Sequence, residues 1–147
     1  IREHGFNILT QHIIRPTNKN DRAIYKKAID LWEKEKKQLQ YKDLPRELQK
    51  QKNVTTHQNR FTVVKGDQQF AHTVLAHISI DGHYYIHPDK TQKRSISLRE
   101  AARIQSFPDN FYFEGSRSAC FKQIGNAVPP FMAEQIAEKI KEMVYEQ

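Results

Sequence analysis

The predicted fold of this chain depends on the stretch His72-Thr-Val-Leu-Ala-His-Ile-Ser-Ile-Asp-Gly-His-Tyr-Tyr-Ile-His87. Two β-prone runs, His72 to Ile80 and His83 to His87, lie on either side of Asp81-Gly82. An Asp-Gly pair between such runs is typical of a two-residue hairpin turn, in which both residues take positive φ angles. The stretch therefore predicts an antiparallel hairpin, with His77 on one face and His83 and His87 on the other.

The segments around the predicted hairpin contain one further strand and several helices. Arg60 to Lys65 is rich in β-prone residues and ends at the turn pair Gly66-Asp67, which predicts a strand. Helical spacing predicts a first helix from Asp21 to about Leu39, and Asp43-Leu44-Pro45 opens a short helical segment after it. The capping box Ser97-Leu-Arg-Glu100 predicts a helix from Leu98 to about Ser106. A last helix begins at Pro129-Pro130 and runs nearly to the C-terminus. These elements make the chain α+β, with a small antiparallel sheet or hairpin and flanking helices.

The positive charge of the chain is concentrated in its first part. Residues 1–60 hold 14 Lys and Arg against 7 Asp and Glu, whereas residues 61–147 hold 10 of each kind. Because Lys and Arg neutralise phosphates, a polyanionic partner is one interpretation. A basic surface that only keeps the protein in solution is an equally good one on charge alone. Lys26 and Lys34, on the polar face of the first predicted helix, fit either interpretation.

The composition argues against several other classes of protein. No apolar run approaches the ~20 residues that cross a bilayer, so no membrane partner is expected. Cys120 is the single cysteine, which rules out an internal disulfide and favours a reducing compartment such as the cytoplasm. No metal site is expected from the histidines, because the hairpin register separates them and zinc needs converging ligands.

Cys120 is not predicted to be a nucleophile. A catalytic thiol needs a base, a cation or a helix N-terminus that lowers its pKa. Arg117 and Lys122 are near in sequence, but such neighbours are common in a basic chain. A small, partly buried apolar role is expected instead. The glycines are dispersed and form no Gly-rich phosphate-binding loop.

Two stretches resemble the conserved motifs of a known family. Arg94-Ser-Ile-Ser-Leu-Arg-Glu-Ala-Ala-Arg-Ile-Gln-Ser-Phe-Pro-Asp109 resembles motif IX of the DNA (cytosine-5)-methyltransferases. Lys122-Gln-Ile-Gly-Asn-Ala-Val-Pro-Pro130 resembles motif X of the same family, in the family's order and at its close spacing. The resemblance covers roughly Val74 to the C-terminus. The residues before Val74 fall where the family keeps its variable target-recognition domain.

The resemblance implies roles for particular residues. In the family, motif X helps to bind S-adenosylmethionine, so the cofactor candidates are Asn126, Ala127 and Val128. The motif IX helix implies a rigid support for a DNA-reading module, with the capping and pairing residues Ser97, Arg99, Glu100 and Arg103. Residues 1–93 correspond to the target-recognition region, and residues 94–147 to motifs IX and X with a C-terminal helix that packs on the catalytic lobe. The DNA-contact candidates, chosen by chemistry and position, are Arg60, Lys65, His83, His87, Lys26 and Lys34.

The catalytic motifs of the family are absent from this sequence. The family's nucleophile is a cysteine in a Pro-Cys motif, supported by a Glu-Asn-Val motif and a Gly-rich cofactor loop. None of these occurs here, and Cys120 follows Ala119. No catalytic residue is assigned, and the chain by itself is expected to be inactive. The missing initiator Met favours a C-terminal fragment whose Rossmann-like catalytic lobe lies upstream.

The resemblance implies that the complete protein methylates carbon-5 of a flipped cytosine in double-stranded DNA, with S-adenosylmethionine as methyl donor. Two alternatives stay open: a DNA-binding specificity subunit that acts in trans with a separate catalytic chain, and an inactive relative kept as a structural partner. The apolar stripe of the last helix predicts self-association of the isolated piece. Restriction–modification is one setting for such an enzyme, and the DNA target sequence does not follow from the residues.

Overall fold

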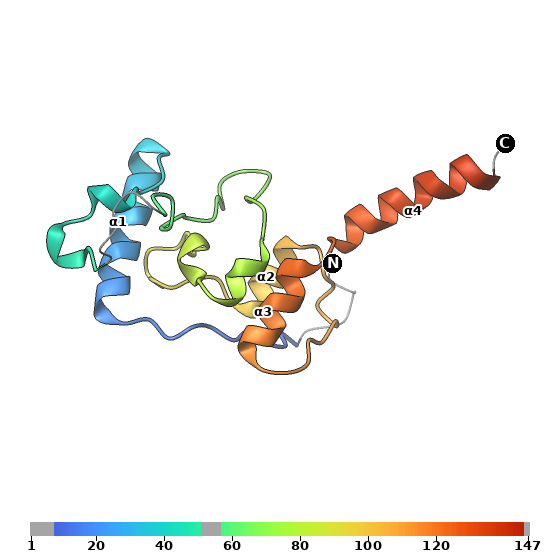
Figure 1. Cartoon of the computed structure of the whole chain (residues 1–147), viewed down its shortest axis with the longest axis horizontal. Helices are drawn as coiled ribbons and strands as arrows, with labels where there is room; N and C mark the ends of the chain where they lie inside the picture. Colours follow the sequence, from blue (N-terminus) through green and yellow to red (C-terminus); the bar gives the residue numbers. More distant parts are fainter. Residues whose placement is uncertain (1–7, 51–56, 146–147) are drawn as a thin grey trace. The chain divides into compact units, whose positions relative to one another are not determined.

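The computed structural model describes residues 8–50 and 57–145 of the chain (Figure 1). The chain divides into two compact units. Unit 1 comprises Ile1–Ile13, Val74–Ser79 and Leu98–Gln147, and unit 2 comprises Ile14–Thr73 and Ile80–Ser97. Each unit therefore joins segments that are far apart in the sequence.

Unit 2 contains the helix α1 (Lys19–Glu35), which confirms the first predicted helix. Asn18 caps the helix: its side chain accepts a hydrogen bond from the Asp21 amide, while the Asp21 carboxylate accepts one from the Asn18 amide. The helix ends where Lys36 takes a left-handed conformation, with a φ of 57°, and its amide donates to the Trp32 carbonyl. These two caps set the bounds of α1 slightly before those that the sequence predicts.

The core of unit 2 forms on the apolar face of α1. Tyr25, Ile29 and Trp32 are buried on this face, together with Ile24 and Ala28. They pack against buried residues of the later segments, which are Leu39, Tyr41, Leu44, Phe61, Val63 and Ile86. In the sequence, the short 3-10 helices η1 (Tyr41–Asp43) and η2 (Arg46–Leu48) lie between the core residues Leu39 and Phe61. η2 corresponds to the short helical segment predicted after Asp43.

The predicted hairpin of residues 72–87 is wrong. The stretch forms two 3-10 helices instead, η3 (Ala76–Ser79) in unit 1 and η4 (Gly82–Tyr84) in unit 2. A type I′ turn needs a positive φ at both central residues, whereas the φ of Asp81 is −127°. The Asp81 carboxylate accepts a hydrogen bond of 2.9 Å from the His83 amide. This local bond starts η4, because Asp side chains compete with regular backbone pairing.

Gly82 lies close to two side chains and does not have a positive φ. A Cβ at this position would lie 2.8 Å from Arg15 Cδ and 2.9 Å from Ser95 Oγ. The Asp-Gly pair is therefore explained by the capping chemistry of Asp81 and by a close approach at Gly82.

The predicted strand Arg60 to Lys65 joins no sheet. Pairing in the described part of the chain is limited to isolated bridges, which join Leu39 to Phe61, Val63 to Ile86, and Ile86 to Ser95. The Gln38 side chain accepts from the Val63 amide at 2.8 Å and donates to the Val63 carbonyl at 3.0 Å. The described residues form these isolated bridges but no sheet, so the predicted α+β class with a small antiparallel sheet is wrong, and the regular elements in the described part of the chain are helices.

Unit 1 contains α2 (Leu98–Ile104) and α3 (Arg117–Asn126), which contact each other (Figure 1). α2 begins after Ser97 and ends before Pro108, as the sequence predicts. Ser106 has a φ of 61°; its amide donates to the Arg103 carbonyl, and the Phe107 amide donates to the Ala102 carbonyl. This pair of bonds is a Schellman motif that closes the helix.

Gly125 allows η3 to pack closely against α3. A Cβ on Gly125 would lie 2.6 Å from the Leu75 carbonyl oxygen and 2.7 Å from Ala76 Cα. Around this contact the core of unit 1 includes Val74, Ile78, Leu98, Phe121 and Ile124, all 3% exposed or less. A side chain at position 125 would push backbone against backbone, so glycine is required there.

The last helix, α4 (Pro130–Tyr145), confirms the helix predicted from Pro129-Pro130. None of its described residues is buried. Its apolar residues Phe131, Met132, Ile136, Ile140, Met143 and Val144 are between 47% and 64% exposed. Among the residues that the structure describes, no helix is long and apolar enough to cross a bilayer.

Candidate DNA interface and cofactor segment

Arg60 lies in unit 2 beside the residue that starts η4. Its Nε lies 2.8 Å from Asp81 Oδ2, and the two side chains are 25% and 20% exposed. The other carboxylate oxygen of Asp81 accepts the hydrogen bond from the His83 amide. Among the described residues Arg60 Nε has no hydrogen-bond partner, so its contact with Asp81 is an ion pair without a directed N–H bond. The ion pair holds the Arg60 guanidinium beside Asp81, and a quarter of the Arg60 side chain is exposed.

His83, a second predicted DNA contact, is tied into the core of unit 2. Its Nδ1 shares a hydrogen bond of 2.7 Å with the Tyr25 hydroxyl, and its ring lies edge-on to Tyr25 and Phe61. Burial lowers the pKa of His83 and raises that of Tyr25. A neutral imidazole beside a protonated hydroxyl suits this hydrogen bond, so His83 has a clear role in joining α1 to η4.

His87 and Lys65 are half-buried. The His87 ring accepts a hydrogen bond of 3.2 Å from the Asp89 amide through Nδ1. The Lys65 ammonium lies 5.8 Å from the centre of the Trp32 ring. Both side chains therefore make internal contacts, and their assignment to DNA binding stays a prediction.

Lys26 and Lys34 lie on the exposed part of α1, away from its buried face. Neither side chain belongs to the buried residues of α1. Both lysines are therefore exposed, and their assignment to DNA binding stays a prediction.

Sequence reasoning missed a polar group at the end of α1. Asp67 accepts a hydrogen bond of 3.3 Å from Trp32 Nε1 and pairs with the Lys36 ammonium. Lys36 holds the pKa of Asp67 below its usual value. These side chains border an open pocket of about 360 Å³, which Gly66 and Pro88 also line. The Gly66-Asp67 turn was visible in the sequence, but its contact with Trp32 was not.

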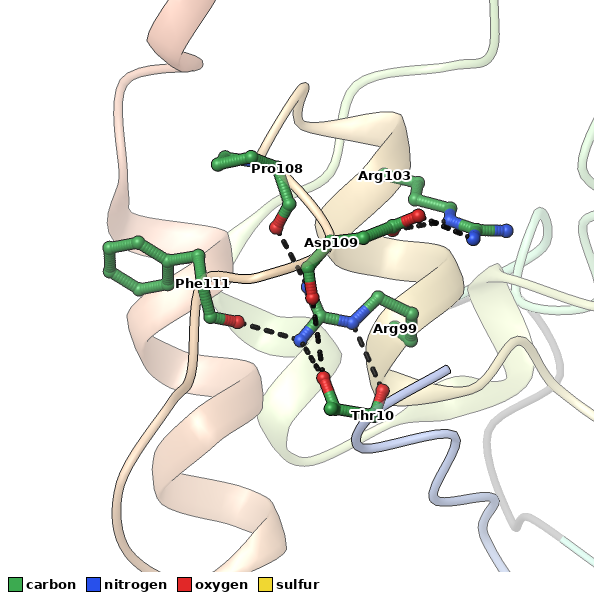
Figure 2. Close-up of polar contacts among 6 residues, drawn as sticks. All are labelled: Thr10, Arg99, Arg103, Pro108, Asp109 and Phe111. Atoms are coloured by element: carbon green, nitrogen blue, oxygen red, sulfur yellow. Dashed lines mark hydrogen bonds and ion pairs between the residues drawn. The ribbon is translucent and has the colours of Figure 1, made fainter. Parts of the chain in front are cut away.

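Arg99, from the motif IX stretch, is the central residue of a polar cluster in unit 1 (Figure 2). Its side chain is 1% exposed. Its guanidinium donates to the carbonyls of Thr10, Pro108 and Phe111 at 3.1, 3.0 and 2.6 Å, and to the Thr10 hydroxyl at 3.0 Å. Arg99 thus fastens residue 10 and the loop after α2 to that helix.

Arg103 and Asp109 form a two-pronged ion pair next to Arg99 (Figure 2). Arg103 Nε and Nη2 each lie 2.7 Å from one Asp109 oxygen, and Asp109 is 4% exposed. Asp109 raises the pKa of Arg103. Asp109, which sequence reasoning did not single out, is therefore the partner of Arg103 within unit 1. Ser97 is buried and Glu100 half-buried, and their capping bonds stay a prediction.

The cofactor candidates lie between α3 and α4. Asn126 is the last residue of α3 and is exposed, and the Ala127 amide donates to the Ile124 carbonyl at 3.3 Å. Val128 is 58% exposed. The start of α4 offers few amide donors, because Pro129 and Pro130 lack an N–H and the Phe131 amide donates to Ser106 Oγ at 3.1 Å. Among the three cofactor candidates, the exposed groups are therefore the side-chain amide of Asn126 and the side chain of Val128.

Cys120 is 2% exposed and lies inside unit 1. Burial raises the pKa of its thiol, which keeps it protonated and unreactive at neutral pH. Among the described residues, no group of three or more His, Cys, Asp or Glu side chains is placed to hold a metal ion.

Comparison with known proteins identifies the family. Residues 4–142 match the family model described as C-5 cytosine-specific DNA methylase. The chain therefore belongs to the C-5 cytosine-specific DNA methylases, and the resemblance seen in motifs IX and X is confirmed. No solved structure matches the chain.

The relatives are longer proteins. The chain is 48% identical over 135 residues to Type II methyltransferase M.Bpa9945I of Bacillus paralicheniformis, which covers 92% of this chain and 30% of that protein. It is 51% identical over 71 residues to Type II methyltransferase M.AgeI of Thalassovita gelatinovora, covering 48% of this chain and 16% of that one. Rice DNA (cytosine-5)-methyltransferase 1B is 52% identical over 58 residues, which are 40% of this chain and 4% of the rice protein. The chain thus spans less than a third of the relatives it matches.

Proposed function

We propose that this chain is the C-terminal portion of a DNA cytosine-5 methyltransferase. In this proposal it contributes DNA target recognition and part of the S-adenosylmethionine site for methyl transfer to carbon-5 of a flipped cytosine. The family membership and the 48% identity to a Type II methyltransferase support the class of enzyme. The recognition region corresponds to residues 1–93, and residues 94–147 carry motifs IX and X.

The distribution of charge between the two units carries the recognition part of the proposal. Unit 2 contains 17 Lys and Arg against 9 Asp and Glu, whereas unit 1 contains 7 against 8. The whole positive surplus of the chain thus belongs to unit 2. A unit that binds duplex DNA needs such a surplus, because phosphate neutralisation supplies much of the affinity. Lys26 and Lys34 supply phosphate contacts in this proposal, while Arg60 contacts the bases.

The segment Asn126 to Val128 supplies the cofactor contacts. Asn126 offers an amide and Val128 an apolar side chain, both at the surface of unit 1. These groups fit the carboxylate or hydroxyl groups and the apolar edge of S-adenosylmethionine, respectively. The chain's own residues would bind and orient the cofactor, which supplies the methyl group when it is bound.

The catalytic lobe lies upstream in this proposal. The Pro-Cys and Glu-Asn-Val motifs are not part of this sequence, so the chain by itself transfers no methyl group. The exposed apolar residues of α4 pack on the catalytic lobe, and they cause self-association when that lobe is missing.

Transfer of labelled methyl groups from S-adenosylmethionine to cytosine-containing duplex DNA tests the proposal. Activity is expected in a protein extended upstream by the catalytic lobe and not in this chain alone. Activity restored by mixing the chain with a separate catalytic chain would favour a specificity subunit that acts in trans. Activity of this chain alone, abolished in Cys120→Ser, would contradict the proposal.

A further inference from the structure

Ile80 is 86% exposed, although it is a large apolar residue. It belongs to unit 2 and directly precedes Asp81. Single exposed apolar residues are common in proteins and need no explanation by themselves. The neighbours of Ile80 therefore decide whether its position has a function.

Ile80 precedes Asp81 in the sequence, and Asp81 pairs with Arg60, so we call these residues with Asn59 the Arg60–Ile80 cluster (Asn59, Arg60, Ile80 and Asp81). Asp81 pairs with Arg60 at 2.8 Å, and Asn59 is exposed beside Arg60 in the sequence. The cluster thus places an apolar side chain, a guanidinium and an amide on residues that are joined by one ion pair.

The backbone of the cluster is held by local bonds. The Arg60 amide donates to the His57 carbonyl at 3.0 Å, and the Thr62 hydroxyl donates to the Asn59 carbonyl at 2.6 Å. The Thr62 amide donates to the His83 carbonyl at 3.2 Å. Rigid support of this kind is what a reading side chain needs, since an error of about 1 Å weakens a directed contact.

The chemistry of the cluster matches the edges of base pairs. An arginine fork reads O6 and N7 of guanine, and apolar side chains contact the methyl group of thymine. The surplus of positive charge in unit 2 points to duplex DNA as the occupant, because it complements the phosphates on either side of a base contact.

We infer that Arg60 reads a guanine of the DNA target through its terminal nitrogens, that Asp81 is the positioning residue for Arg60, and that Ile80 makes the apolar contact with an adjoining base. The inference rests on the proposed function and adds the base class that the target contains. Asp81 suits its role because one carboxylate oxygen holds Arg60 Nε while the other is fixed by the His83 amide.

The test uses the upstream-extended enzyme and a library of duplexes with random sequence around a cytosine, with methylated cytosines located by bisulfite sequencing. The wild type is expected to prefer a guanine at one position near the methylated cytosine. Arg60→Lys keeps the charge and loses the fork, so the preference at that position should fall by about tenfold or more. Its salt dependence of DNA binding should stay unchanged, because the charge is kept.

Asp81→Asn separates positioning from folding. The amide oxygen still accepts from the His83 amide, so η4 stays intact, whereas Arg60 loses its ionic partner. The guanine preference should fall by about tenfold, with an unchanged midpoint of urea unfolding. Restored preference in Asp81→Glu would support positioning, since the carboxylate returns. A variant that changes only the unfolding midpoint would overturn the role of Asp81.

Ile80→Ala has a matched control in Phe70→Ala, because Phe70 is also a large exposed apolar residue of unit 2, at 73%. Ile80→Ala should weaken preference at one position next to the guanine, and Phe70→Ala should change none. An active wild type whose base preference is the same in Arg60→Lys, Asp81→Asn and Ile80→Ala would overturn the inference alone. A wild type that methylates no duplex would overturn the proposed function and the inference with it.

Discussion

Arg99 in unit 1 and Arg60 in unit 2 occupy contrasting environments. Arg99 is 1% exposed and donates to the carbonyl and hydroxyl oxygens of Thr10, Pro108 and Phe111. Arg60 is 25% exposed and pairs with the carboxylate of Asp81. Because its donors are used inside the protein, Arg99 stabilises the fold, whereas Arg60 has one ion pair and a partly exposed side chain, which our proposal places against DNA. Burial and partners therefore give these two arginines different roles.

The largest effect is expected from Arg99→Met. It leaves the carbonyls of Thr10, Pro108 and Phe111 without their donor, at a cost of about 1 kcal/mol or more each, so unfolding should become easier by about 3 kcal/mol. Arg60→Met should cost less than about 1 kcal/mol, because partly exposed ion pairs contribute little. Urea unfolding followed by circular dichroism measures both. Equal losses in the two variants would contradict the contrast between these arginines.

Gly125→Ala should cost about 2 kcal/mol, because the new methyl group would press on the backbone at Leu75 and Ala76. Asn126→Ala is the matched control at the next residue, which is exposed. It should leave stability unchanged and lower the affinity of the extended enzyme for S-adenosylmethionine, measured by calorimetry. A destabilised Asn126→Ala with normal affinity would remove this residue from the cofactor site.

A loss of about 1 kcal/mol is expected for Ser106→Ala, because the Phe131 amide at the start of α4 loses its acceptor. Ser106→Gly removes the same hydroxyl but relieves the left-handed backbone, so it should be less harmful. Hydrogen exchange at the first turn of α4 reports on the cap directly. If exchange there is unchanged in Ser106→Ala, the hydroxyl does not cap α4.

The smallest effect concerns pH. Burial lowers the pKa of His83 and of His72, whose Nε2 donates to the Tyr84 carbonyl at 2.9 Å. The folded state then binds fewer protons than the unfolded state, whose histidines titrate near 6.5. Stability of unit 2 should therefore be complete above about pH 6.5 and fall as the pH drops below it.

Trp32, the single tryptophan of the chain, lies in unit 2 and reports its unfolding by fluorescence. Between pH 7.5 and 5.0 the fluorescence-detected melting temperature should fall, and the fall should be smaller in His83→Gln. The same fall in both proteins would show that other groups cause it. Arg99→Met should leave this pH dependence unchanged, since Arg99 belongs to unit 1.

The helices were predictable from local residues, and the hairpin was not. α1, α2 and α4 follow apolar spacing, caps and prolines that act within a few residues. The stretch around Asp81 carried an equally clear turn signal, yet the Asp81 side chain bonds to the His83 amide and starts a 3-10 helix. Likewise, Gln38 occupies the backbone groups of Val63, which a strand pattern in residues 60–65 does not reveal.

By itself, the sequence determined the family and the positions of α1, α2 and α4, because motifs IX and X and the helix signals lie in continuous stretches, whereas α3 was not predicted. Only the tertiary structure decided which polar side chains are used inside the protein. The Arg99 guanidinium donates to the Thr10 carbonyl, 89 residues earlier in the chain. Arg60 forms an ion pair with Asp81. Such contacts depend on how distant segments pack, and side-chain hydrogen bonds there override local β propensity.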